Sequence, residues 1–198
     1  MASPFMVTLD PKHYSTKPGA RDAAAITRRM QEAEAVELTP PALREHVANG
    51  GAWMGGTYEP RKGGWGEFAG QRIFALDFDN ETHDKPKRPL HPGEAGYIGP
   101  LDAVRVCLDC DVEPMLLYFT FGARLDPLHC KFRLVIDNGE VASTEQEARA
   151  VLDDLLAAFP EADQSCKNPN RLFYGSGGEC WPLYDWLNRD GGWRSWVR

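Results

Sequence analysis

Two aspartates at the end of an apolar run limit what this chain can fold into. Residues 72–80 read RIFALDFDN. A strand points alternate side chains to opposite faces, so Asp77 and Asp79 share one face while Phe74, Leu76 and Phe78 share the other. Either the two acids bind divalent cations through their oxygens, which suits phosphoryl transfer, or Asp79 and its neighbour are the turn that ends the strand. Because the carboxylates repel each other, removing one is expected to leave stability unchanged or higher.

Length, charge and cysteine content limit the class of protein. A chain of 198 residues fits one medium domain, or a core domain with an elaboration. The net charge of −7 argues against a protein that coats nucleic acid through bulk charge. A polymerase-type enzyme remains compatible with it, because such an enzyme collects acids at its metals. The sequence contains neither a signal-peptide pattern nor an apolar run of the ~20 residues that a membrane helix needs.

Five cysteines, an odd number, favour a reducing cytoplasm over a disulfide framework. We therefore expect a cytoplasmic protein that does not enter the membrane. Cys107 and Cys110 form a C-x-x-C pair, but no second pair completes a set of zinc ligands. The pattern does not favour zinc.

The first 70 residues are predicted to form an N-terminal helical and Gly-rich elaboration packed on the core. Residues 1–20 are expected to be extended or loose, and residues 21–36 have apolar side chains at helical spacing. A second helix begins after Thr39, its expected N-cap, and ends at Gly50-Gly51. Residues 50–66 are rich in glycine and predict a loop or an irregular hairpin.

Residues 71–198 are predicted to form the core domain and a Trp-rich C-terminal tail. The expected elements are a strand at 71–79, a helix at 99–110, strands at 113–121 and 129–137, a helix at 144–159 and a short strand at 171–175. Thr144 and Glu147 form a capping box at the start of the second of these helices. The order βαββαβ predicts an α+β fold with a ferredoxin-like, or RRM-like, core and strand order 4-1-3-2.

This topology brings three distant segments to one edge of the sheet. The end of the first strand lies beside the start of the third, which carries His129, Lys131 and Arg133. These cations either form salt bridges with the acids or hold the triphosphate of a nucleotide. The entry to the fourth strand adds Asp163, which is either a turn residue or a third metal ligand.

The segments FALDFDN, YFTF followed by HCKFRLVI, and ADQSCKNPNRLFYGS resemble the catalytic core of the archaeo-eukaryotic primase superfamily. The nearest match is the primase-polymerase domains of phages, plasmids and integrated elements, over about residues 70–176. The resemblance implies that Asp77, Asp79 and Asp163 bind two Mg²⁺ or Mn²⁺ ions and are catalytic. It also implies nucleotide contacts, which we assign to His129, Lys131, Arg133 and Arg171.

The chain departs from the superfamily in its second motif, usually Ser-x-His on the central strand. Gly122 stands where a serine is expected, and Lys131-Phe132-Arg133 occupies the strand. The three acids favour a template-directed nucleotidyltransferase acting in replication of a phage, plasmid or mobile element. The missing Ser-x-His favours the alternative, a primase-like module that binds single-stranded DNA or a replication partner without chemistry.

The implied partners are a single-stranded DNA template, nucleoside triphosphates, and a helicase that is either separate or fused to this domain. The tryptophans of the tail either stack on template bases or pack the small core. Other enzymes with this topology fit less well. A rolling-circle nicking endonuclease needs a His-x-His pair, and a cyclase-type palm needs acids in the hairpin between the second and third strands.

Overall fold

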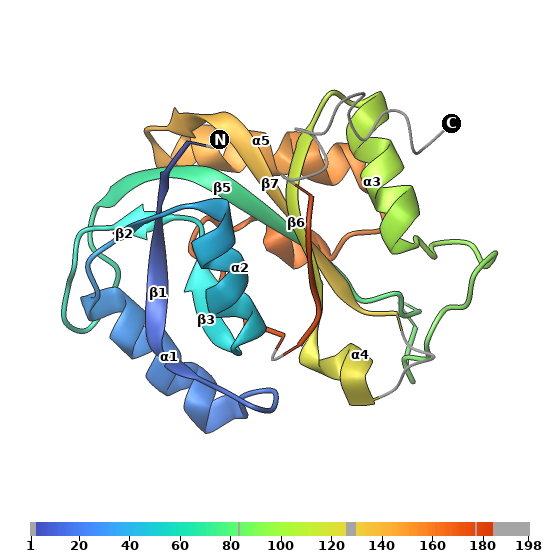
Figure 1. Cartoon of the computed structure of the whole chain (residues 1–198), viewed down its shortest axis with the longest axis horizontal. Coiled ribbons are helices and arrows are strands. Elements are labelled where there is room, and N and C mark those ends of the chain that lie inside the picture. Colours follow the sequence, from blue (N-terminus) through green and yellow to red (C-terminus); the bar gives the residue numbers. More distant parts are fainter. Residues whose placement is uncertain (1–2, 83, 126–129, 177, 184–198) are drawn as a thin grey trace.

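The computed structural model describes residues 3–82, 84–125, 130–176 and 178–183. Within these ranges the chain has an α+β fold with two antiparallel sheets and five α-helices (Figure 1). The elements in chain order are β1 (Phe5–His13), α1 (Ala20–Glu32), β2 (Val36–Leu38), α2 (Pro40–Ala48), β3 (Gly51–Met54), β4 (Thr57–Tyr58), β5 (Phe68–Phe78), α3 (Pro100–Asp109), β6 (Glu113–Phe119), α4 (Phe121–Leu125), β7 (Phe132–Ala142), α5 (Glu145–Ala158), the 3₁₀ turn η1 (Gln164–Lys167) and β8 (Cys180–Pro182). None of the helices in these ranges is long and apolar enough to span a bilayer.

The larger sheet has the strand order β4-β5-β7-β6-β8. Its three central strands are the first, third and second strands of the predicted core, and they stand in the predicted relative order. The acid-bearing strand β5 pairs antiparallel with β7, and β6 pairs antiparallel with the other edge of β7. The complete ferredoxin-like arrangement stays a prediction, because the fourth strand differs.

The segment predicted as the fourth strand, residues 171–175, contains one isolated bridge, between Phe173 and Trp53 of β3. Phe173 exchanges both of its backbone hydrogen bonds with Trp53, each at 2.9 Å. Its backbone groups are therefore already used and cannot extend a ladder along β5. The short strand β4 pairs with β5 instead, where the fourth strand was expected.

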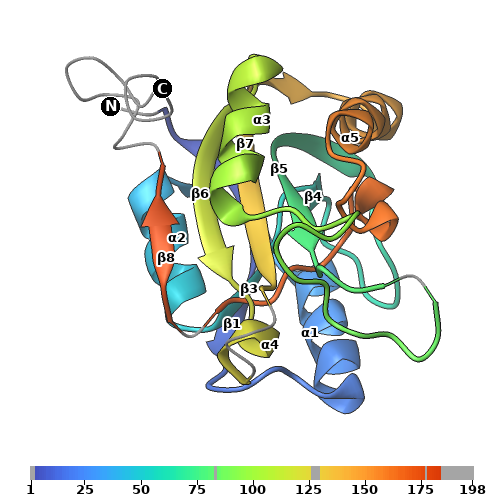
Figure 2. The same cartoon turned by 90° about the vertical axis from the view of Figure 1, so that its right-hand side faces the viewer.

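The two faces of the larger sheet bury different parts of the chain. On one face, Phe78 of β5 stacks on Phe132 of β7, with ring centroids 4.7 Å apart, and meets Phe159 at the end of α5. The opposite face of β5 carries Asp77. Figure 2 shows α2 on one side of the strands β6, β7 and β5, and α5 on the other. The alternation predicted for this strand is therefore confirmed.

The N-terminal segment is more regular than expected. Residues 5–13 form β1, the central strand of the smaller sheet, between β2 and β3. In the C-terminal half of β1 the buried carboxylate of Asp10 accepts two hydrogen bonds from Arg29 of α1, at 2.6 and 2.8 Å. Phe5 and Val7 belong to the same apolar cluster as the residues of β5, β6 and β7. The domain boundary at residue 70 stays a prediction.

The predicted helices are found with shifted ends. Helix α5 begins after Thr144, whose hydroxyl accepts a hydrogen bond from the backbone N–H of Glu147 at 3.2 Å, and Glu147 accepts one from the backbone N–H of Ser143. The capping interaction predicted from sequence is thus present. In the tail, Trp181 of β8 packs edge-on against Phe119, with centroids 5.3 Å apart. The other tail tryptophans lie outside the described residues.

Candidate active site

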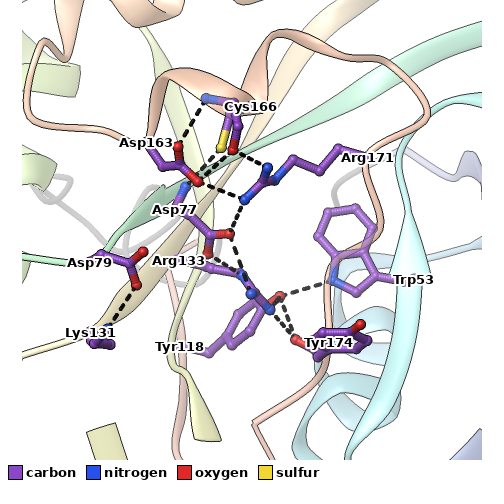
Figure 3. A network of polar contacts seen from close by, with 11 residues as sticks. Trp53, Asp77, Asp79, Tyr118, Lys131, Arg133, Asp163, Cys166, Arg171 and Tyr174 are labelled. Atoms are coloured by element: carbon purple, nitrogen blue, oxygen red, sulfur yellow. Dashed lines mark hydrogen bonds and ion pairs between the residues drawn. The ribbon is translucent and has the colours of Figure 1, made fainter. Parts of the chain in front are cut away.

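The acid-bearing strand and the basic strand are direct neighbours. Asp77 of β5 lies opposite Arg133 of β7, and Arg133 lies opposite Tyr118 of β6. Because residues opposite each other in antiparallel strands project to the same face, these three side chains form a row across the sheet (Figure 3). The prediction that Arg133 shares a face with the acid is confirmed.

Asp77 is buried, with 7% of the residue exposed, and both of its carboxylate oxygens face arginines. Oδ1 accepts a hydrogen bond from Nε of Arg133. Oδ2 accepts one from Nη2 of Arg171 at 3.0 Å and a longer one from Nη2 of Arg133 at 3.4 Å. A carboxylate removed from water requires such partners to remain ionised. Asp77 is therefore the centre of a buried ionic network.

Arg133 is held by contacts on every side. Its Nη1 donates to the backbone carbonyl of Tyr174 and lies 3.5 Å from the hydroxyl of Tyr118. That hydroxyl accepts a hydrogen bond from Nε1 of Trp53 at 3.0 Å. Burial alone would lower the pKa of Arg133, but the charge of Asp77, together with the contacts with Tyr118 and the hydrogen bond to Asp77, holds the pKa above its ordinary value. Burial raises the pKa of the Tyr118 hydroxyl to about 12, so this group stays protonated at neutral pH.

Asp163 ends a loop beside Asp77 and begins the 3₁₀ turn η1. Its Oδ1 accepts a hydrogen bond from the backbone N–H of Ser165 at 2.9 Å, and its Oδ2 accepts one from the Ser165 hydroxyl at 2.6 Å. Its own N–H donates to the carbonyl of Asp77 at 2.8 Å. Burial would raise the pKa of Asp163, but the Ser165 hydrogen bonds and the charge of Arg171 lower it overall. Asp163 is thus both a capping residue of a turn and a neighbour of Asp77.

The thiol of Cys166 completes the group around Asp77. Its Sγ accepts a hydrogen bond from the backbone N–H of Asp77 at 3.3 Å. Among the described residues, one group of three or more potential metal ligands lies close together: Asp77, Asp163 and Cys166, whose ligand atoms are within 4.8 Å of one another. Burial raises the pKa of the Cys166 thiol to about 12, so it is a neutral thiol at physiological pH. In the part of the chain that the structure describes, Cys107 of α3 and Cys110, which follows the helix, belong to no such group.

Asp79 lies farther out and faces a different cation. Its side chain is 47% exposed, and its Oδ1 is 3.3 Å from Nζ of Lys131. The same ammonium donates to Oε1 of Glu81. Burial would raise the pKa of Glu81, but the hydrogen bonds and charges of Lys131 and Lys87 together outweigh it and lower the pKa. Lys131 therefore lies between two carboxylates.

Several of these charged groups, though not Asp163 or Glu81, line one open polar cavity of about 210 Å³. Its wall includes two acids, Asp77 and Asp79, and four cations: Lys17, Lys131, Arg133 and Arg171. The backbone around Gly122 and Gly175 forms further parts of the wall. The cavity lies on the face of the sheet that the N-terminal elements cover. It is small and polar, so its chemistry suits charged groups better than an apolar ligand.

The donor atoms at this site fit a hard divalent cation, with one condition. Carboxylate oxygens of Asp77 and Asp163 are the ligands that Mg²⁺ and Mn²⁺ prefer, whereas a protonated thiol contributes little to such a site. The space between these two carboxylates is taken by Nη2 of Arg171, which is 3.0 Å from Asp77 and 2.8 Å from Asp163. A metal ion can bind both acids only if the Arg171 guanidinium moves out of the space between them.

Most of the residues predicted for the site lie together. Asp77, Asp163, Arg133 and Arg171 form one connected network, and Asp79 with Lys131 forms a second pair at the outer edge. His129 lies outside the described residues.

Sequence reasoning missed Lys17, which lies in an N-terminal segment with no motif. It also missed Tyr118, although pairing β6 with β7 by their apolar alternation would have placed Tyr118 beside Arg133. Comparison with known proteins gives no match to a family model, to a curated protein or to a solved structure.

Proposed function

We propose that this protein is a template-directed nucleotidyltransferase of the primase-polymerase kind, acting on a single-stranded DNA template with nucleoside triphosphates. The observation that carries the proposal is the position of Asp163 beside Asp77. These two acids, far apart in sequence, lie side by side, and Asp77 also lines a polar cavity whose wall carries two lysines and two arginines. Phosphoryl transfer requires acidic side chains that bind divalent cations and basic side chains that bind phosphates.

In this proposal Asp77, Asp79 and Asp163 would hold two Mg²⁺ or Mn²⁺ ions. When bound, such ions lower the pKa of the attacking hydroxyl and neutralise charge on the leaving phosphates. The 3′-oxygen of the growing strand attacks the α-phosphorus, the bond to the β-phosphate oxygen breaks, pyrophosphate leaves, and the hydroxyl proton passes to solvent. The chain's own contribution is to position the reacting groups and to supply cations for the phosphates.

The cations divide into two groups by what they contact. Arg133 is 8% exposed and is fully engaged with Asp77, Tyr118 and Tyr174, which supports a role in positioning Asp77. Lys17, Lys131 and Arg171 are the cations better suited to reach phosphates, because Lys17 is exposed and the side chains of Lys131 and Arg171 are more exposed than that of Arg133. In this structure Arg133 forms a salt bridge with Asp77, one of the two roles considered from the sequence. Its contact with a nucleotide stays a prediction.

A primer-extension assay tests the proposal. Primed and unprimed single strands are incubated with nucleotides and either Mg²⁺ or Mn²⁺, using the wild type and Asp163→Asn. We expect extension by the wild type and its loss in the variant, since an amide is a poorer ligand and leaves metal charge uncompensated. Arg72→Met is a matched control, because Arg72 pairs with Asp137 on the same sheet but away from the cavity. Full activity in an Asp77→Ala/Asp79→Ala double variant would exclude this mechanism.

One observation favours the second candidate function, a binding module without chemistry. Asp77 is already neutralised by two arginines, so the network is complete without a metal ion. For such a module the same assay gives no extension with either metal, while single-stranded DNA still binds. A fluorescence anisotropy titration with a labelled oligonucleotide, run in parallel, separates the two functions.

A further inference from the structure

One nitrogen of Arg171 lies between two carboxylates that come from separate parts of the chain. Nη2 donates to Oδ2 of Asp77 at 3.0 Å and to Oδ2 of Asp163 at 2.8 Å. Without a positive charge between them, these two carboxylates would repel each other. We propose that Arg171 is an internal counter-cation that a divalent metal ion displaces when it binds between Asp77 and Asp163. This inference rests on the metal site of the proposed function and adds how that site is filled.

Arg171 and a metal ion would compete for the same oxygens. Mg²⁺ and Mn²⁺ approach carboxylate oxygens to roughly 2.0–2.2 Å, and both of them repel a guanidinium charge at such short range. The contacts of Arg171 with Asp77 and Asp163 must therefore break, or lengthen greatly, when both acids bind the ion. The protein exchanges one cation for another, so the carboxylates are never left uncompensated.

The two arginines of the network differ in how easily they can move. Arg133 is buried and anchored by a backbone carbonyl and a tyrosine hydroxyl as well as by Asp77. The Arg171 side chain is 24% exposed, and its Nε is buried without a hydrogen-bond partner among the described residues. Leaving a buried N–H unsatisfied is unfavourable. Nη1 donates to the Ser165 hydroxyl, so the present position of Arg171 is held by the two acids and by Ser165. Arg171 is therefore the arginine that moves when a metal ion binds.

A displaced Arg171 side chain stays near the site. Arg171 itself lines the polar cavity together with Lys17 and Lys131. The freed guanidinium thus adds a forked donor group to the wall that faces an anionic ligand. Arg171 is a positioning residue in the absence of metal, and metal binding makes its charge available to the cavity.

Metal affinity, measured without nucleotide or DNA, tests the exchange. Mn²⁺ is titrated into the wild type, Arg171→Met and the control Arg72→Met, and free Mn²⁺ is followed by electron paramagnetic resonance. Methionine removes the charge but keeps an unbranched apolar side chain, and Arg72 likewise forms a two-point pair with an acid of the sheet. We expect Arg171→Met to bind Mn²⁺ about tenfold more tightly than the wild type and Arg72→Met to match the wild type.

A second measurement uses the unaltered protein, so that it does not depend on how well a variant folds. The side-chain Nε–H signals of the arginines are recorded by NMR during a titration with Mg²⁺. We expect the Arg171 signal to move together with the backbone amide of Asp163, while the Arg72 signal stays in place. An Arg171 signal that stays fixed while the Asp163 amide responds to Mg²⁺ overturns the exchange.

The outcomes separate this inference from the proposed function. Equal Mn²⁺ affinity in the wild type and Arg171→Met refutes the exchange but leaves the enzyme proposal standing. Tighter Mn²⁺ binding by Arg171→Met, combined with no primer extension by the wild type, supports the exchange and refutes the enzyme proposal. Absence of Mn²⁺ binding in both proteins refutes both.

Discussion

Arg133 stands directly opposite Asp77 in the β5–β7 ladder, and its guanidinium faces both oxygens of that carboxylate. The pair couples the two central strands through a buried ionic contact. The Tyr118 hydroxyl, which accepts a hydrogen bond from Trp53, contacts the arginine from its other side. Stability and site geometry therefore depend on the same side chains.

Replacing Asp77 by alanine is expected to destabilise the fold. Two acids on one strand face predicted the opposite, because that prediction rested on their mutual repulsion and not on the alternative of salt bridges with the third strand. Arg133 and Arg171 reverse the sign, since removal of Asp77 leaves the buried Arg133 without its carboxylate partner and Arg171 with one of its two acids. The free energy of unfolding, measured in urea, should fall by about 3 kcal/mol or more.

Asp79→Ala is the matched control for that experiment. This side chain is about half exposed, so its contact with Lys131 is weakened by solvent. Its loss should change the free energy of unfolding by less than ~1 kcal/mol. Equal losses for the two variants would contradict the central role of Asp77.

Tyr118→Phe is expected to cost about 1–2 kcal/mol of unfolding free energy, because it leaves the buried N–H of Trp53 without its acceptor. Tyr58→Phe provides a control of the same chemistry. The Tyr58 hydroxyl is buried with no hydrogen-bond partner among the described residues, so its removal should be neutral or stabilising. Thermal unfolding followed by circular dichroism compares the two, and a smaller loss for Tyr118→Phe than for Tyr58→Phe would count against the network.

The cysteines should differ sharply in their reaction with iodoacetamide at pH 8. Cys110 is exposed, whereas Cys107 and Cys166 are buried with pKa values raised by burial to about 12. Alkylation requires the thiolate, and a thiol of that pKa is ionised to only about one part in ten thousand at pH 8. Peptide mass spectrometry should find Cys110 modified first and Cys166 modified only after unfolding in urea. Rapid modification of Cys166 in the folded protein would show that the turn η1 opens.

Stability should decrease as the pH falls below about 6.5, in part through His46. Burial lowers the pKa of this imidazole, whose Nε2 lies 3.0 Å from the carbonyl of Ala52. The unfolded state then binds a proton more readily than the folded state, so the stabilising contribution is present above the unfolded pKa and is lost on acidification. In His46→Gln the free energy of unfolding should vary less between pH 7.5 and 5 than in the wild type.

The parts of the fold that follow local rules were predictable from the sequence. The alternation in β5 places Asp77 opposite to Phe78, and the hydroxyl of Thr144 marks the start of α5. The relative order of β5, β7 and β6 follows from the sequence of elements. The fourth strand was not predictable, because the backbone partner of Phe173 is Trp53, in a glycine-rich segment that gives no pairing signal.

The sequence predicts which residues form the site better than it predicts the contacts between them. Acid spacing identifies Asp77 and Asp79, and the expected topology brings Asp163 near them. No local pattern reveals that Arg171 lies between Asp77 and Asp163, because that contact depends on the path of the loop after α5. Lys17 reaches the cavity through the packing of the N-terminal segment, which has no counterpart in the motifs of the core.

The double hydrogen bond between Trp53 and Phe173 has a consequence for how this protein can be divided. A fragment that begins at residue 71 would lack Trp53, and with it both the donor to Tyr118 and the backbone partner of Phe173. The segment that carries Arg171 would lose its tether at the same time. The N-terminal third of the chain therefore contributes Lys17 to the cavity and supports the segments behind it, so we expect a fragment without it to lose the geometry of the site.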